Sequence, residues 1–424
     1  MTRSVGDSDS VRRQNRGLLL GALRAGGPQS RTALATLTGL SHASVTAIMQ
    51  DLLAQGLVEE MSAAAGREDT RSRGRPAILV GFQRHAVYAA LFEIDVNRAR
   101  LSLVDYSGIL VDRIESDITP TTFKTKTPED FLAERVKSLM ERTPEAGGAL
   151  RRVAISVQGI LDREGGGLKW SPIAGLAGTN MVASLQNLLE LPVSLHKRGR
   201  LLAEGTRWLD PELLDASVAT VFVGSTVAMG LSLHGQITGR GEDGATEFGH
   251  MNHIPNGALC RCGMRGCIEA YAADYGVLRT AYSVPETAAP APAVPAQQYE
   301  ALIQRAEMGD RAATHGFNLA GRAIGYGLSR MLAMFDPSHI LIVGPGARAL
   351  GLMRSEIEGA LKTSLICKIN GLPDIRAHSD EKEPIFRGLM MKTLSDIDQN
   401  TFAGMPSAER AGGQIVRARS QAAQ

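Results

Sequence analysis

Short amphipathic runs separated by glycine-containing breaks fill the first part of the chain. Apolar side chains recur at helical spacing until the Gly-Gly-Pro stop at 26–28, which predicts a first helix over residues 10–24. Ser30 is a good N-cap for a second helix over residues 31–37, and Gly39 can take the positive φ that commonly ends a helix. Two helices joined by a tight break are therefore expected before residue 40.

A third helix follows at once, with Ser41 as its N-cap. Its apolar residues follow the i, i+3, i+4, i+7, i+8 rule and form one face: Val45, Ile48, Met49, Leu52 and Leu53. The opposite face is small and polar, which suits a recognition helix that enters a DNA major groove N-terminus first. The residues expected to face the bases are His42, Ala43, Ser44, Thr46 and Gln50.

From residue 57 the pattern changes to two short strands around an arginine-bearing loop. The return strand is predicted over residues 77–82, so that the two strands form a hairpin. The loop carries Arg73, Gly74 and Arg75, whose extended backbone can place two guanidinium groups against phosphates or in a minor groove. The alternative is a charged loop that does nothing beyond contacting solvent.

These elements together predict a winged helix-turn-helix domain over residues 1–82. The segment has ten arginines, no lysine and seven acidic residues, a net charge of +3, while the remaining 36 basic and 37 acidic residues sum to −1. Arg31, at the start of the second helix, joins the expected DNA contacts. The alternative is a three-helix module that binds another protein. One such domain contacts few base pairs, so we expect a homodimer or homotetramer on double-stranded operator DNA.

Beyond residue 83 the pattern becomes that of an α/β protein. Strands are predicted over residues 88–95, 100–105, 109–113 and 153–157, and a helix over residues 128–141. Further on, a long helix over residues 311–335 precedes a buried strand over residues 340–343. We expect this α/β body to occupy residues 83–402 and to be followed by a disordered tail over residues 403–424.

Composition excludes several classes of protein. With 424 residues, 44% of them apolar, 21% charged and a net charge of +2, the chain is typical of a globular protein of two or three domains. No run approaches the roughly 20 apolar residues of a membrane span, and the first 16 residues lead into no signal-peptide core. We therefore expect a cytoplasmic protein without a membrane partner.

Three of the four cysteines lie within eight residues and favour a metal site. Cys260, Cys262 and Cys267 follow His250 by a short interval, and three thiols with one imidazole complete a tetrahedral zinc set. Four protein ligands leave no open position, so the predicted zinc is structural. The alternative is a group of buried cysteines without metal beside an ordinary histidine.

The chain resembles the ROK family of transcriptional regulators and sugar kinases. The resemblance rests on N-R-G-L-L-L at 15–20, S-R-T-A-L-A-T-L-T-G-L-S-H-A-S-V-T-A-I-M-Q-D-L-L-A-Q-G-L-V at 30–58, G-R-P at 74–76 and the zinc motif, and it extends to about residue 400. It implies an actin-like ATPase fold of two α/β lobes around a cleft. It also implies that Glu247, His250 and Glu269 hydrogen-bond a sugar, with His250 shared between zinc and ligand.

Elements that the resemblance associates with phosphoryl transfer are altered. The first phosphate loop of the family is glycine-rich, whereas residues 93–99 retain only Asp95. The catalytic Asp of the kinases follows an Asn, but residues 194–200 contain neither, and His196, followed by Lys197 and Arg198, is a poor substitute. The glycine segment at 224–230 is as well explained by a buried β-turn. We therefore expect no kinase activity.

The predicted function is a sugar-responsive transcription factor, most simply a repressor of carbohydrate transport or catabolism genes. Two alternatives stay open: a ROK sugar kinase with a fused DNA-binding domain, and a regulator that has lost small-molecule sensing. The sequence identifies neither the effector nor the operator.

Overall fold

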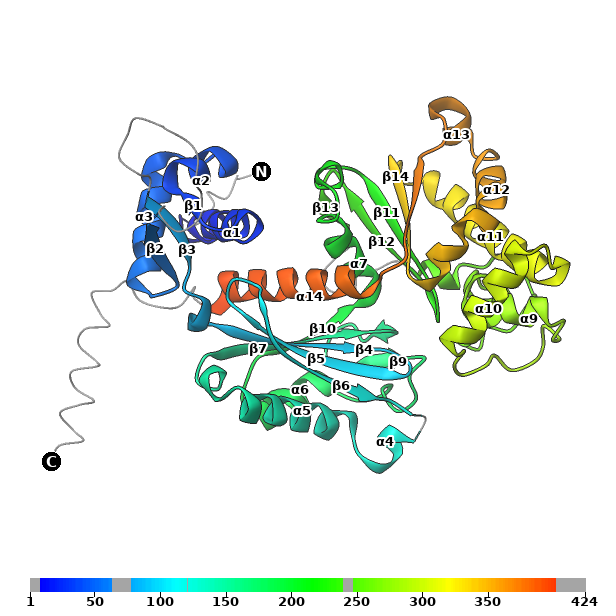
Figure 1. The fold of residues 1–424 in the computed structure, drawn as a ribbon, viewed down its shortest axis with the longest axis horizontal. Coiled ribbons are helices and arrows are strands. Elements are labelled where there is room, and N and C mark those ends of the chain that lie inside the picture. The colour runs from blue at the N-terminus through cyan, green and yellow to red at the C-terminus, as the bar shows by residue number, and fades with distance from the viewer. Residues whose placement is uncertain (1–7, 63–77, 120, 239–246, 402–424) are drawn as a thin grey trace, which may run out of the picture.

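The structure is a computed structural model that describes residues 8–62, 78–119, 121–238 and 247–401. Its N-terminal domain stands at one end of a two-lobed body (Figure 1). The helices of this domain are α1 (Ser8–Gly26), α2 (Arg31–Thr38) and α3 (His42–Ala54). Its small sheet has the order β1-β3-β2, formed by β1 (Gln29–Ser30), β2 (Val58–Ser62) and β3 (Ile78–Phe82).

Local capping chemistry explains why the helices of the N-terminal domain begin and end where they do. Ser30 Oγ accepts a hydrogen bond from Ala33 N at 3.1 Å, and Ser41 Oγ accepts one from Ser44 N at 3.1 Å. Gly39 takes a φ of 69° between the two helices. The three predicted helices and both predicted strands of the domain are thus confirmed, whereas most of the arginine-bearing loop lies outside the described residues.

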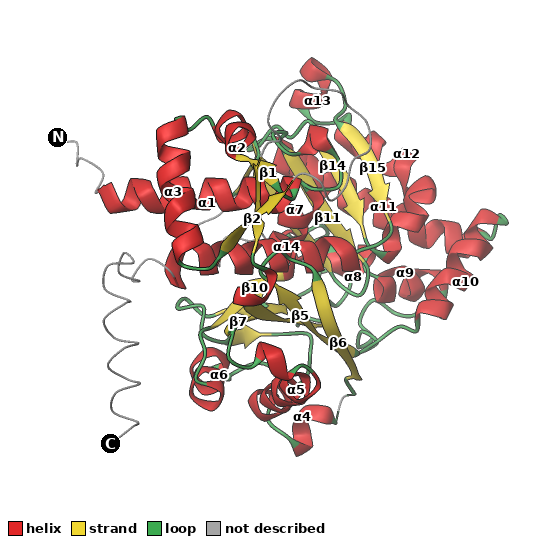
Figure 2. Cartoon of the chain, turned by 60° about the vertical axis from the view of Figure 1, so that its left-hand side comes forward, coloured by secondary structure: helices red, strands yellow, loops and turns green. Residues whose placement is uncertain are grey.

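The first lobe is built on a five-stranded mixed sheet of order β10-β7-β4-β5-β6. Its strands are β4 (Tyr88–Ile94), β5 (Arg98–Asp105), β6 (Leu110–Asp117), β7 (Leu150–Val157) and β10 (Val193–Lys197). Figures 1 and 2 both show α5 (Pro128–Arg142) and α6 (Met181–Leu189) on one face of this sheet and α14 (Lys382–Asp396) on the other. The small hairpin of β8 (Ile160–Leu161) and β9 (Leu168–Trp170) follows β7.

The second lobe contains another five-stranded mixed sheet, of order β13-β12-β11-β14-β15. Its strands are β11 (Val218–Val223), β12 (Val227–Leu233), β13 (Gln236–Ile237), β14 (His339–Val343) and β15 (Asp374–His378). The helices of this lobe are α8 (Glu269–Ala272), α9 (Asp274–Ala281), α10 (Ala296–Glu307), α11 (Arg311–Leu332), α12 (Leu350–Leu361) and α13 (Leu365–Asn370). One large apolar core joins the sheet to these helices.

Two helices, α7 (Arg198–Thr206) and α14, pack against each other where the lobes meet. The fit depends on two glycines: a Cβ on Gly205 would lie 1.8 Å from the carbonyl oxygen of Pro384, and one on Gly388 would lie 2.0 Å from that of Leu201. Because α7 also contacts β11 and β12, and α14 contacts β4 and β7, the pair connects both sheets.

Two body elements differ in length from the expectation. The strand predicted over residues 109–113 is β6, which continues to Asp117 because it pairs with β5 as far as Arg98. The helix predicted to reach residue 335 ends at Leu332, where Met334 N and Phe335 N both bond to the carbonyl oxygen of Met331. The other predicted strands and helices of the body are confirmed to within a few residues.

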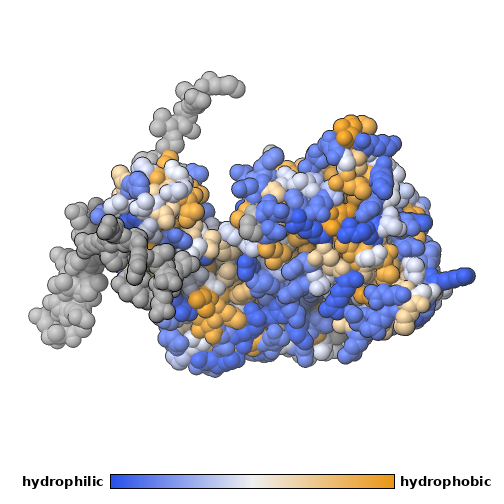
Figure 3. Space-filling view, turned by 45° about the horizontal axis from the view of Figure 1, so that its top comes forward, coloured by the Kyte–Doolittle hydropathy of each residue, from blue (hydrophilic) through white to orange (hydrophobic). Residues whose placement is uncertain are grey.

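The surface is mainly hydrophilic on the face drawn in Figure 3, with hydrophobic residues in separate patches. Among the described helices, none combines the length and the apolar character that crossing a membrane requires.

Candidate functional site

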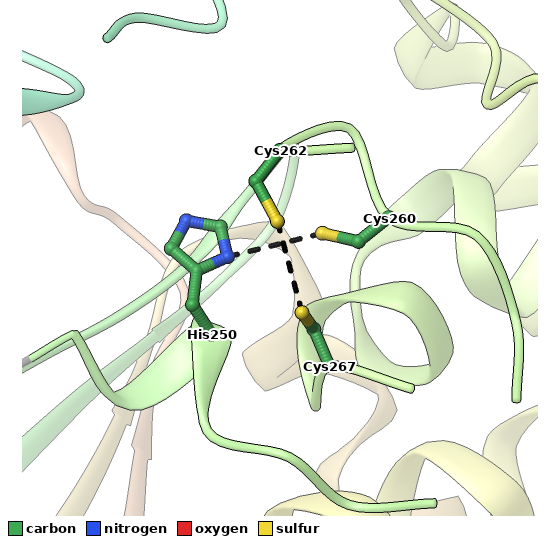
Figure 4. Close-up of side chains that lie close together, drawn as sticks. All are labelled: His250, Cys260, Cys262 and Cys267. Carbon is green, nitrogen blue, oxygen red and sulfur yellow. Dashed lines mark hydrogen bonds between the residues drawn. The ribbon is translucent and has the colours of Figure 1, made fainter. Parts of the chain in front are cut away.

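Four side chains gather beside the second sheet in a geometry that fits a metal ion. The ligand atoms of His250, Cys260, Cys262 and Cys267 all lie within 4.8 Å of one another. His250 Nδ1 lies 3.8 Å from Cys260 Sγ, and Cys262 Sγ lies 3.7 Å from Cys267 Sγ (Figure 4). A tetrahedral ion with bonds of about 2.3 Å to sulfur separates its ligand atoms by about 3.8 Å, so the four residues fit one ion. We call these four residues the metal cluster.

The backbone of the motif brings the sulfurs together. Gly266 has a φ of 80°, and a Cβ there would lie 1.7 Å from the carbonyl oxygen of Ile254. Gly266 N in turn bonds to Ala258 O, and Cys260 N bonds to Met264 O. The turn between the second and third cysteines therefore requires glycine at position 266.

The electrostatics of the metal cluster also favour a cation. Hydrogen bonds with Cys260 and Cys267 lower the pKa of the Cys262 thiol, whereas Cys260 and Cys262 raise the pKa of Cys267. Burial opposes protonation of His250, but hydrogen bonds to Cys260 and Cys262 outweigh it and raise the pKa of the imidazole to about 11. Three thiols at this spacing cannot all ionise unless a positive charge lies between them, and a divalent metal supplies that charge.

A small cavity of about 60 Å³ lies against the metal cluster and between the lobes. Its charged and polar lining residues are Gln158, Lys197, Arg198, Thr226, Glu247, His250 and Glu269. The structure thus brings together the three residues expected to bind a sugar, and His250 lines the cavity while its Nδ1 faces Cys260. The ring of Trp170, which also lines the cavity, lies edge-on to His250 at 5.4 Å.

Glu247 and Glu269 occupy different environments in this cavity. Glu269 is buried and accepts a hydrogen bond from Val227 N at 3.2 Å; burial, reinforced by the charge on Cys260, raises the pKa of its carboxyl to about 7. Glu247 is half exposed and accepts a hydrogen bond from Lys197 Nζ at 2.9 Å. Sequence analysis missed Lys197 as a cavity residue, because its partner lies 50 positions away.

A larger cavity of about 330 Å³ also lies between the lobes. Its wall includes Asp95, Gly224 and Pro345, so the two altered segments singled out in the sequence, 93–99 and 224–230, do converge here. Residues 224–226 form the tight turn between β11 and β12, as the β-turn interpretation requires. Arg198 lines both cavities, and its Nη1 donates to Asp95 Oδ2 at 3.0 Å.

Most charges around the large cavity are already paired within the protein. Arg100 pairs with Glu93 at 3.3 Å, and Arg348 pairs with Glu300 at 2.7 Å. Burial alone would raise the pKa of Asp95, but Arg198 and hydrogen bonds from Val96 N and Gln158 hold it below its usual value. His196 lies elsewhere: it is fully buried, bonds to Ser194 Oγ at 2.9 Å and lines neither cavity.

The N-terminal domain presents the predicted face of α3 to solvent. His42, Ala43 and Gln50 are exposed, Ser44 and Thr46 are half-buried, and the apolar face packs into the core. Arg31 forms an ion pair with Glu60 at 2.7 Å. The remaining predicted contacts, Arg73, Gly74 and Arg75, lie outside the described residues.

A buried polar cluster attaches this domain to the body. Arg24 of α1 pairs with Asp398 at 2.9 Å, with 3% and 2% of the two side chains exposed. Tyr106 Oη donates to Asp398 Oδ1 at 2.9 Å, and Arg16 Nη2 donates to the carbonyl oxygen of Asp398 at 2.9 Å. We call Arg16, Arg24, Tyr106 and Asp398 the Asp398 cluster. No sequence motif predicted this cluster.

The apolar surroundings of the Asp398 cluster join the same parts of the chain. One core contains Leu19 and Leu23 of α1 together with Leu389 and Leu394 of α14 and residues of the first sheet. Asp398 itself lies in the short π-helix η7 (Ile397–Thr401), which continues α14. In Figure 1, α14 extends from the second lobe to the N-terminal domain.

Comparison with known proteins identifies the body. Residues 93–389 match the model of the ROK family. The chain belongs to the ROK family. Residues 14–68, which contain α2 and α3, match the MarR family.

Similar proteins share both parts of this ROK chain. The xylose repressor of Bacillus subtilis strain 168 is 23% identical over 370 residues, 85% of this chain and 91% of that protein. A crystal structure described as a ROK family transcriptional regulator, a homolog of the E. coli MLC protein, superposes with a TM-score of 0.70 at 19% identity. That match covers 93% of this chain and 98% of the other. These matches confirm a helix-turn-helix domain followed by the ROK fold.

The ROK body alone resembles kinases. A ROK family glucokinase from Streptomyces griseus, in complex with glucose and AMPPNP, superposes with a TM-score of 0.54 at 18% identity. The match covers 71% of this chain and 98% of the glucokinase chain. At that identity the likeness concerns the fold alone, and it confirms the expected actin-like sugar-kinase architecture of the two lobes.

Proposed function

We propose that this ROK protein is a DNA-binding transcriptional regulator, a repressor of carbohydrate transport or catabolism genes that responds to a sugar or sugar derivative. One observation carries the proposal: a helix-turn-helix with an exposed recognition face is joined, through a buried core and the Asp398 cluster, to a body whose interlobe cavity holds polar ligand-binding groups. The relatives named as sugar repressors support the same conclusion.

At the DNA, α3 enters a major groove and places His42, Ala43, Ser44, Thr46 and Gln50 toward the bases. Its largely exposed N-terminal turn carries no acidic side chain, which supports this placement because the positive end of the helix dipole favours approach to phosphate. Arg31 releases Glu60 and contacts a DNA phosphate in its place. This is feasible because both side chains are partly exposed and ion pairs of that kind are weak. Arg73, Gly74 and Arg75 of the wing contact the neighbouring backbone or minor groove. Two copies bind a two-fold operator as a homodimer or a dimer of dimers.

In the body, Glu247, His250 and Glu269 bind hydroxyl groups of the effector, and a structural zinc ion held by His250, Cys260, Cys262 and Cys267 fixes their positions. The donor set favours zinc, which prefers thiolate and imidazole in tetrahedral geometry. Because all four positions are taken by protein, the metal orients His250 and the start of α8 and does no chemistry of its own.

The signal travels through α7 and α14. Lys197, Arg198 and Gly199 line the small cavity where α7 begins, and α7 is packed on α14 at the two glycine contacts. The 15 residues of α14 span about 22 Å and lead directly into η7 and Asp398. A change of lobe angle on ligand binding therefore moves the N-terminal domain as it moves α14, and alters the separation of two recognition helices in a dimer.

The body performs no phosphoryl transfer in this proposal. His196 is buried away from both cavities, and Arg198 with Asp95 bridges the region between them. An assay for ATP-dependent phosphorylation of hexoses and amino sugars tests this point, with turnover reviving the kinase alternative.

The function is tested by footprinting the full-length protein on fragmented DNA of its source organism, with and without sugars. Discrete two-fold sites beside carbohydrate genes, released by one compound, are expected. The variant Glu247→Ala should keep the same sites and lose the saturable response, whereas the exposed control Glu307→Ala on α10 should retain both. Sites that no compound releases would contradict sensing, and an absence of sites at low salt would contradict the regulator itself.

A further inference from the structure

The small cavity contains two buried cationic side chains whose hydrogen-bonding capacity the described residues do not use up. Lys197 is 10% exposed, and the one acceptor that the described residues offer its three N–H groups is Glu247. Arg198 is 9% exposed and engages Asp95 through Nη1, but its Nε is buried without a partner among those residues. Buried donors of this kind cost free energy unless something in the cavity accepts from them.

The backbone at the same point adds to the positive potential. Lys197 is the N-cap of the nine-residue helix α7, Arg198 is its first residue, and no side chain caps it. Lys197, Arg198 and Gly199 all line the small cavity, so the N-terminal turn of α7 borders it together with the two cations. An anion bound there gains from the helix dipole as well as from the side chains.

The cavity also offers hydrogen-bond acceptors beside these cations. Gln158 is buried, with 5% of the residue exposed, and its Nε2 donates to Asp95 Oδ1 at 2.9 Å. This bond fixes the orientation of the amide because an ionised carboxylate can only accept. The Oε1 of Gln158 is then a buried acceptor without a partner among the described residues, and the carboxylate of Glu247 lies on the same cavity. A hydroxyl group suits these acceptors.

We propose that the effector is a hydroxylated compound that carries one anionic group, a sugar acid or a sugar phosphate. Lys197 binds the anion at the N-terminus of α7, and Gln158 accepts from a hydroxyl. The anion replaces Glu247 as the partner of Lys197, and this replacement is favourable. The carboxylate of Glu247 is 45% exposed and stays hydrated after it releases the ammonium, whereas Lys197 has little access to water. The inference rests on the proposed function and specifies the ligand class of its site.

Calorimetric titration of the full-length protein with matched compounds tests the inference. Each series contains a neutral sugar, the corresponding sugar acid and the sugar phosphate, for glucose, galactose, N-acetylglucosamine and xylose. In one series the acid or the phosphate should bind at least tenfold more tightly than the neutral sugar. The carboxylate and phosphate arms then distinguish the two sources of the anion.

Variants at Lys197 separate charge recognition from general damage. Lys197→Met should weaken binding of the anionic compound at least tenfold, about 1.4 kcal/mol, and change binding of the neutral sugar less than threefold. Lys197→Arg should recover part of the preference, and Lys169→Met, at an exposed lysine of β9 that lines neither cavity, should change nothing. Inorganic phosphate at millimolar concentration should compete with the anion in the unaltered protein. Thermal melting and metal content verify that each variant folds.

Two outcomes overturn the inference in different ways. If neutral and anionic members of the responsive series bind equally, or if Lys197→Met weakens both alike, the effector is neutral and the proposed function stands without this refinement. If no member of any series binds or releases DNA, the proposed sensing function fails together with the inference. DNA binding measured without any sugar remains a separate test of the N-terminal domain.

Discussion

The metal cluster and the Asp398 cluster are both buried polar groupings that hold segments of this ROK protein together, but they are assembled in opposite ways. The metal cluster takes its four residues from one stretch, 250–267, with Cys262 and Cys267 only five positions apart. The Asp398 cluster joins residues separated by 374 positions between Arg24 and Asp398 and by 292 between Tyr106 and Asp398. The first is a local motif, and the second exists only where three parts of the fold meet.

This difference affects what each cluster can do. A local motif keeps its geometry whatever the lobes do, so it suits a fixed wall of a binding site. The Asp398 cluster joins α1, the end of β5 and the extension of α14, so its contacts form only while these three segments keep their relative positions. We therefore expect damage at the metal cluster to appear first as lost stability and ligand binding, and damage at the Asp398 cluster to appear as lost communication.

The largest effect is expected from Cys262→Ser. Loss of one of four ligands should reduce bound metal from about one per chain to well below half, and should lower the free energy of unfolding on the order of 5 kcal/mol, because metal binding is coupled to folding. Elemental analysis and thermal melting measure both quantities. Cys367→Ser, at the buried cysteine remote from the cluster, is the control that should retain the metal. Equal metal content in both variants would argue against the cluster.

A smaller loss, about 3 kcal/mol, is expected from Asp398→Asn. The change leaves Arg24 buried without its counter-ion and weakens the acceptor of Tyr106. Denaturant unfolding measures the loss, and DNA release measured alongside effector binding tests communication: the effector should still bind but release DNA less. Asp396→Asn, which removes the i,i+4 pair that Asp396 makes with Lys392 on α14 among the described residues, should cost about 1 kcal/mol or less. Normal release by Asp398→Asn would assign the cluster to stability alone.

Asp95→Asn should lower stability on the order of 1 kcal/mol at pH 7, with a characteristic pH dependence, because the Asp95 side chain is 35% exposed and water screens its pair with Arg198. The pKa of Asp95 in the folded protein lies below its unfolded value, so its contribution is fully present above about pH 4 and is lost as pH falls through the folded pKa. The difference between the unaltered protein and the variant should therefore shrink in acid, as chemical unfolding between pH 3 and 7 would measure. The exposed control Asp117→Asn should show no such trend, and a difference that stays constant in acid would contradict the ion pair.

The smallest effect on the fold is expected from Gln50→Ala at the exposed face of α3. Stability should change by less than about 0.5 kcal/mol, whereas discrimination at one operator base pair should fall by about 1 kcal/mol. Binding to a panel of single-base operator variants measures this, with Gln298→Ala on α10 as the control. Uniform weakening on every sequence would instead place Gln50 against the DNA backbone.

Sequence reasoning succeeded where the relevant interactions are local. Ser30, Gly39 and Ser41 determine helix ends through contacts a few residues long, so the helix-turn-helix was predicted almost residue by residue. The spacing of the three cysteines with His250 likewise predicted the metal cluster. Predictions that depend on contacts between separate segments were less accurate. The last residues of β6, for example, are strand because β5 supplies their hydrogen-bonding partners.

The cavity residues divide in the same way. Glu247, His250 and Glu269 were named because the resemblance to the ROK family implies that they bind a sugar. The contacts of Lys197 with Glu247 and of Gln158 with Asp95 could not be predicted, because nothing in their own segments indicates that the ends of β10 and β7 face these carboxylates. Trp170 reaches the cavity only through the small β8–β9 hairpin.

The sequence by itself thus determined the class of the protein: a helix-turn-helix with its capped helices, a ROK body, and four clustered residues that could bind a metal ion. The tertiary structure decided how these parts work together. Only packing places Lys197 against Glu247, brings α7 onto α14 at two glycines, and buries Arg24 with Asp398. The physical reason is that burial and charge pairing depend on distance in space, and no local pattern records which distant side chain will share a low-dielectric site.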